Sequence, residues 1–178
     1  MSFSAICTAF VAAPLRRLSA THQKLRPDFT SFSEGLRIGA EIYHTLGKIL
    51  RTEGLPATVG DEGGFAPNLS TDEEALDLIV RAIKESGYTT ETVKIALDCA
   101  ASEWYSEDGS YRTPKRGLQY SRRTLIDRWA ELVESYPIFS IEDGLDQRDF
   151  EGWSELTERL GNRILLVGDD LFVTPSSV

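Results

Sequence analysis

The stretch PIFSIED, residues 137–143, is an almost continuous apolar run that ends in two adjacent acids. It does not alternate strictly between polar and apolar residues, which is typical of a parallel strand buried on both faces. Pro137 prevents a preceding helix from continuing into the run. VKIALD (93–98) and RILLVGDD (163–170) have the same design. These three runs therefore predict buried strands that each end in acid.

Amphipathic helical segments separate these runs. They cover residues 31–54, 70–88, 121–137 and 149–161. Ser31 with Glu34, and Thr71 with Glu74, have the spacing of a capping box at the start of a helix. Strands that alternate with helices predict a parallel α/β architecture. An Asp108-Gly109 pair after the second run predicts a small hairpin.

The composition limits the classes of function. The chain has 178 residues and a net charge of −9, which disfavours a general affinity for nucleic acid or anionic membranes. No apolar run reaches the ~20 residues of a membrane span. Cys7 and Cys99 make no disulfide framework, so a reducing, cytoplasmic location is the default expectation.

The first residues of the chain differ in composition from the rest. Residues 1–27 contain no acid but several arginines, so they fit either an organelle transit peptide or a disordered extension. We expect residues 1–28 to form an unmatched N-terminal extension. Residues 29–178 are expected to form the folded domain.

Four acidic tips follow short apolar runs. Residues 58–60 lead into Glu62, and the three longer runs lead into Asp98, Glu142 and Asp169. In a parallel sheet or barrel the carboxyl ends of all strands lie on one face, so these acids are expected to converge. Clustered carboxylates repel one another unless a cation neutralises them, and oxygen donors favour Mg²⁺. The alternative is that each acid caps the helix that follows it.

The sequence motifs around these acids are specific. The segments in question are GDEGGFAPNL, ALDCAASEWY, SIEDGLD and LVGDDLFVT, in that order. Together they resemble enolase, over about residues 31–174, and SIEDGLD is similar to the bacterial branch. The resemblance implies a partial (β/α)₈ TIM-type barrel of the enolase superfamily, with about half of the barrel present.

The resemblance also implies roles for individual residues. Asp98, Glu142 and Asp169 match the three carboxylates that hold Mg²⁺. Glu62 matches the acid that contacts the substrate, 2-phosphoglycerate, and helps to expel its 3-hydroxyl as water. The family reaction is the glycolytic hydro-lyase step to phosphoenolpyruvate, in an enzyme that forms homo-oligomers.

Parts of the family pattern find no match here. The N-terminal capping domain is unmatched, and none of the five lysines lies in the motif of the general base. We therefore expect this chain to be a fragment that forms no measurable phosphoenolpyruvate alone. The alternative is a non-catalytic interaction module that pairs with itself or with an intact enolase.

Overall fold

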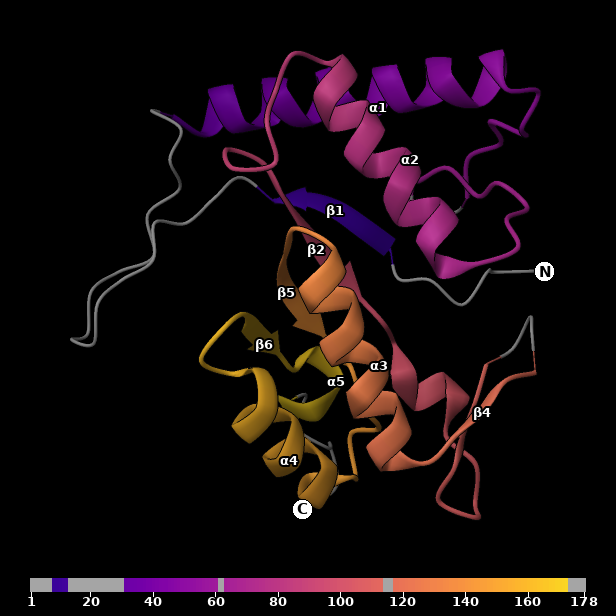
Figure 1. Ribbon diagram of the computed structural model, residues 1–178, viewed down its shortest axis with the longest axis vertical. Helices are drawn as coiled ribbons and strands as arrows, with labels where there is room; N and C mark the ends of the chain where they lie inside the picture. The colour runs from indigo at the N-terminus through magenta and orange to yellow at the C-terminus, as the bar shows by residue number, and fades with distance from the viewer. Residues whose placement is uncertain (1–7, 13–30, 61–62, 114–116, 173–178) are drawn as a thin grey trace. The chain divides into compact units, whose positions relative to one another are not determined.

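The computed structural model describes residues 8–12, 31–60, 63–113 and 117–172 (Figure 1). The chain divides into two compact units: a helical unit of residues 11–95, and a sheet unit of residues 1–10 with 96–178. Among the residues described, none of the helices has both the length and the apolar composition that a membrane crossing requires.

The helical unit contains two long helices that pack against each other, α1 (Phe32–Thr52) and α2 (Asp72–Glu85). The hydroxyl of Ser31 accepts a hydrogen bond from the Glu34 N–H at 3.2 Å, and Thr71 caps α2 in the same way. Each bond satisfies a backbone donor that has no partner inside the helix. The two helix starts predicted from the capping-box spacing are confirmed.

Both helices end at a glycine in the left-handed region and bury one apolar stripe. Gly54 has φ +70° and Gly87 has φ +86°, a conformation that a residue without Cβ adopts at little cost. The buried stripes are Ile42, Ile49 and Leu50 on α1, with Leu76, Ile79, Ala82 and Ile83 on α2. Burial of these side chains is the main stabilising contribution within this unit.

The sheet unit contains most of a four-stranded sheet in the order β1-β2-β5-β6. The strands are β1 (Thr8–Ala12), β2 (Lys94–Asp98), β5 (Ile138–Glu142) and β6 (Leu165–Val167). β5 and β6 pair in parallel, with Glu142 opposite Val167. The three predicted buried runs are therefore strands, and the α/β fold class is confirmed.

Two helices of the sheet unit pack against each other: α3 (Arg122–Ser135) and α4 (Phe150–Leu160). The apolar face of α3, which lies in the predicted amphipathic segment 121–137, is buried and consists of Leu125, Ile126, Trp129, Leu132 and Val133. A short helix, α5 (Asp169–Phe172), follows β6 directly.

The segment after β2 forms a single turn of helix and then an excursion of hairpins. The turn is η1 (Ala101–Trp104). The predicted Asp108-Gly109 turn is confirmed, since Tyr105 and Tyr111 form an antiparallel bridge on either side of it. A second antiparallel pair then joins β3 (Tyr111–Arg112) to β4 (Gln119–Tyr120).

The expectation of a strand at residues 58–60 was wrong. Val59 makes one antiparallel bridge with Phe65, because Gly60 donates its N–H to the Gly64 carbonyl at 2.8 Å and closes the loop on itself. The interpretation of residues 1–28 as an N-terminal extension stays a prediction; of these residues the structure describes 8–12, which form β1 beside β2 in the sheet.

Candidate functional site

Three predicted metal-ligating acids lie at the carboxyl end of the sheet. Asp98 is the last residue of β2, Glu142 is the last residue of β5, and Asp169 opens α5 just after β6. The fourth acid, Glu62, lies outside the described residues. The part of the site that the structure describes therefore belongs to the sheet unit.

Backbone hydrogen bonds join the three strand ends. The Cys99 N–H donates to the Glu142 carbonyl at 2.9 Å, which links the end of β2 to the end of β5. The Asp143 N–H donates to the Val167 carbonyl at 3.0 Å, which links the end of β5 to β6. The acids that follow these strands are thereby held at one edge of the sheet.

The carboxylates at this edge interact electrostatically. Burial is the main cause that raises the pKa of the Glu142 carboxyl above its ordinary value. Repulsion from neighbouring carboxylates raises it further; these are Asp98, Asp143, Asp169 and Asp170. Burial also raises the pKa of Asp143. Negative charge is therefore concentrated at this edge, which favours a cation.

Two residues next to these acids have left-handed backbones without being glycine. Ala100 has φ +42° and Asp143 has φ +44°. Such a conformation costs roughly 1–3 kcal/mol for a residue with a side chain, and it is found most often at functional sites. The Ala101 N–H donates to the Asp143 carbonyl at 2.9 Å, so the two unusual turns are tied together.

The donor chemistry of this edge fits a hard divalent cation. All of its side-chain donors are carboxylate oxygens, the ligands that Mg²⁺ prefers. The Oδ1 atom of Asp143 is buried and has no hydrogen-bond partner in the part of the chain that the structure describes. Among the described residues, however, no three His, Cys, Asp or Glu side chains are gathered as a ready set of metal ligands. A bound cation would have to draw the carboxylates closer together.

The alternative reading, in which the acids are helix caps, is not supported for Asp98. Its Oδ1 accepts the Ala100 N–H at 3.2 Å, but Ala100 is itself the N-cap residue of η1, and among the described residues no side chain caps that helix. The cap of α4 is Asp149, which accepts the Gly152 N–H at 3.1 Å, so Glu142 does not have that task.

Comparison with models of known protein families gives a match over residues 25–178, to "Enolase, C-terminal TIM barrel domain". The match covers most of the chain and includes all four acids named above. The chain belongs to the enolase C-terminal barrel family. Enolase-superfamily sites use one or two Mg²⁺ ions, in agreement with the donor chemistry at the sheet edge.

The loop that follows Glu142 in this enolase barrel is fixed by side chains from three other elements. Trp129 on α3 donates its indole N–H to the Gly144 carbonyl at 2.9 Å. Trp153 on α4 donates to the Asp146 carbonyl at 3.2 Å, and the Asp146 N–H donates to the Tyr111 hydroxyl at 3.1 Å. Each of these bonds holds a backbone group within four residues of Glu142, so side chains of three other elements support the loop.

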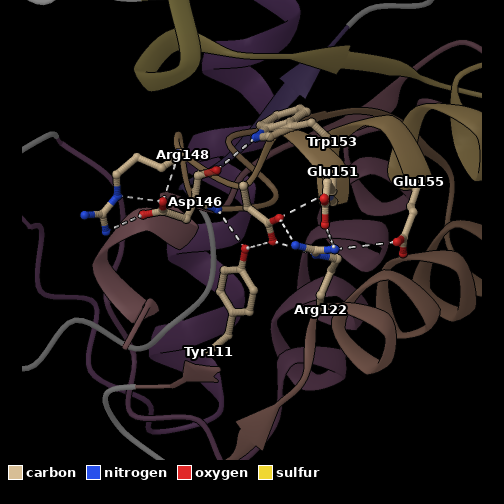
Figure 2. Close-up of polar contacts among 9 residues, drawn as sticks. Tyr111, Arg122, Asp146, Arg148, Glu151, Trp153 and Glu155 are labelled. Atoms are coloured by element: carbon tan, nitrogen blue, oxygen red, sulfur yellow. Dashed lines mark hydrogen bonds and ion pairs between the residues drawn. The ribbon is translucent and has the colours of Figure 1, made fainter. Parts of the chain in front are cut away.

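Figure 2 shows the polar network beside this loop, with Tyr111 and Arg122 pointing at the same carboxylate. That carboxylate is Asp149, which accepts from the Tyr111 hydroxyl at 2.9 Å and from Arg122 at 2.6 Å. Arg122 also pairs with Glu151 and Glu155. Burial raises the pKa of the Tyr111 hydroxyl, and the bond to Asp149 is the main cause that raises the pKa of Arg122.

The helical unit holds the loop of the enolase motif that contains Glu62. Tyr43 on α1 donates its hydroxyl to the Gly63 carbonyl at 3.0 Å, and its ring stacks on Phe65 at 4.5 Å between centroids. Gly47 makes room for this ring, since a Cβ at Gly47 would lie 2.7 Å from the Phe65 ring. The described residues on the C-terminal side of Glu62 are thereby anchored to α1.

Gly47→Ala is expected to lower the free energy of unfolding by about 1–3 kcal/mol, because the added methyl group pushes Phe65 off Tyr43. Gly39→Ala on the same helix is the matched control. A Cβ at Gly39 meets nothing within 4 Å, so alanine should stabilise the helix by about 1 kcal/mol. Urea unfolding of both variants measures the two effects. A gain in stability at both positions would show that a methyl group at position 47 does not displace the Phe65 ring.

Proposed function

We propose that this chain carries the Mg²⁺ ligands and the acid of an enolase of bacterial type, which dehydrates 2-phosphoglycerate to phosphoenolpyruvate. The observation that carries the proposal is the group of interacting carboxylates at the sheet edge, in a chain of the enolase barrel family. Asp98, Glu142 and Asp169 are the proposed ligands. Glu62 is the proposed acid.

The reaction explains why this set of residues is needed. The C2–H bond of 2-phosphoglycerate breaks first, and its proton goes to a base, which the resemblance assigns to a lysine beyond the motifs matched here. Asp98, Glu142 and Asp169 would hold Mg²⁺, whose positive charge would stabilise the developing dianion. The bond between C3 and its hydroxyl oxygen then breaks, and Glu62 donates the proton with which the hydroxyl leaves as water.

The first test of the proposal is Mg²⁺ binding, measured by titration calorimetry. The wild-type chain should release heat on binding, and the triple variant Asp98→Asn, Glu142→Gln, Asp169→Asn should release none, because all three proposed ligand charges are removed. If this variant released as much heat as the wild type, the three acids would not be the Mg²⁺ ligands.

A matched control separates ligand loss from a change in net charge. Asp127→Asn, Glu131→Gln and Glu134→Gln remove the same number of charges from exposed positions on α3. This control should retain the wild-type heat. A loss of heat in both triple variants would show that Mg²⁺ only screens the overall negative charge.

A second candidate is an interaction module without catalysis. It is favoured by β6, which is the edge strand of the described sheet and leaves Val167 partly exposed. An edge strand offers unpaired backbone groups to another chain. Self-association, measured by sedimentation together with an absence of Mg²⁺ binding, would favour this candidate, whereas the enolase proposal expects Mg²⁺ binding in any oligomeric state.

A further inference from the structure

Asp143 is a buried carboxylate that the proposed reaction does not use directly. Asp143 is the residue directly after Glu142 in the chain, and it is only 5% exposed. Its Oδ2 accepts a hydrogen bond from the Asp170 N–H at 3.1 Å, whereas Oδ1 has no partner among the described residues. A buried acceptor without a donor is costly and is therefore uncommon in folded proteins.

The hydrogen bonds of Asp143 hold both sides of the turn that contains Asp169. The Asp143 N–H donates to the Val167 carbonyl before the turn, and the Asp143 carboxylate accepts from the Asp170 N–H after it. The Asp143 carbonyl accepts from Ala101, in the turn after β2. Asp143 therefore contacts the turns that carry the two ligands proposed on either side of Glu142.

The charge of Asp143 is not needed for these bonds. Asparagine has the same shape, accepts the same hydrogen bond and tolerates the left-handed backbone at φ +44°. It would also avoid placing one more negative charge beside four carboxylates. A negative charge that destabilises the protein in the absence of a cation attracts a cation that binds nearby.

We infer that Asp143 is a positioning residue of the Mg²⁺ site: it orients Asp169 through the turn around Gly168, and its charge strengthens the attraction for the cation without direct coordination. This role rests on the proposed function. It adds to that function a residue outside the three ligands. Groups that orient metal ligands commonly affect the affinity for the metal almost as strongly as the ligands do.

The test compares two quantities that a purely structural residue would change in the same direction. Asp143→Asn should leave the melting temperature without Mg²⁺ unchanged or higher, because a repulsive charge is lost. The same variant should bind Mg²⁺ roughly tenfold or more weakly by titration calorimetry. Asp143→Gly, which also loses the bond to Asp170, should bind more weakly still.

Ile83→Ala is the control for a general loss of stability. It removes a buried apolar side chain from α2, so it should lower the melting temperature. It leaves the loop after Glu142 and its hydrogen bonds intact, so the Mg²⁺ affinity should be unchanged. Unchanged affinity in Asp143→Asn, with normal binding by the wild type, would overturn the role of Asp143 alone. A joint fall of melting temperature and affinity in Asp143→Asn would also overturn it, because Asp143 would then be an ordinary structural residue. A wild-type chain that bound no Mg²⁺ would overturn both this role and the proposed function.

Discussion

Replacing Asp149 with alanine is expected to lower the free energy of unfolding by about 3–5 kcal/mol. The variant removes the cap of α4, the acceptor of the Tyr111 hydroxyl and the buried partner of Arg122. The three groups that lose their acceptor come from separate segments of the chain, so no single rearrangement can satisfy them all. A loss of this size is a large fraction of the stability of an ordinary domain.

Urea unfolding followed by circular dichroism measures this loss. Glu134→Ala is the matched control, because it also breaks an arginine–carboxylate pair, with Arg163. Both side chains of that pair are exposed, so water replaces the lost contact and stability should change little. Equal effects of the two variants would show that burial of the Asp149 pair contributes nothing.

Replacing Trp129 with alanine is expected to cost a similar amount, about 3–5 kcal/mol. The indole is buried, lies 6.1 Å from the Trp104 ring between centroids, and holds the Gly144 carbonyl. Its removal leaves a cavity and an unsatisfied carbonyl two residues after Glu142. We therefore expect Mg²⁺ binding to weaken together with stability.

Trp129→Phe separates packing from hydrogen bonding. Phenylalanine retains much of the buried ring but has no N–H for the Gly144 carbonyl, so the expected loss is smaller, about 1–3 kcal/mol. Thermal unfolding and Mg²⁺ titration of both variants check the expectation. An affinity for Mg²⁺ that stayed at the wild-type value in Trp129→Ala would show that this tryptophan does not help to fix the loop after β5.

Local signals in the sequence predicted the elements that depend on local physics. Ser31 and Thr71 cap their helices where the spacing placed them, since a cap requires only residues three apart. The apolar run at 137–143 became a buried strand because its composition suits no exposed element. The convergence of Asp98 and Asp169 on Glu142 followed from the geometry of parallel strands, and their electrostatic effect on Glu142 agrees with it.

The elements that sequence reasoning missed depend on contacts between distant residues. Residues 58–60 had a strand-like lead-in, but the glycines after them allowed the loop to bond to itself. Tyr111, Arg122 and Asp149 had no distinguishing pattern, since each is an ordinary polar residue until the fold brings them together. The one available signal was Asp149 at the start of a helical segment, a position typical of a cap.

The network around Asp149 also constrains the order in which the chain can be assembled during translation. Tyr111 leaves the ribosome 38 residues ahead of its acceptor, and Arg122 leaves 27 residues ahead. At about 5–20 residues per second, the Tyr111 hydroxyl waits roughly a few seconds for its native acceptor. This hydroxyl can therefore form its bond to Asp149 only after β5, which contains Glu142, and the start of α4 have been synthesised.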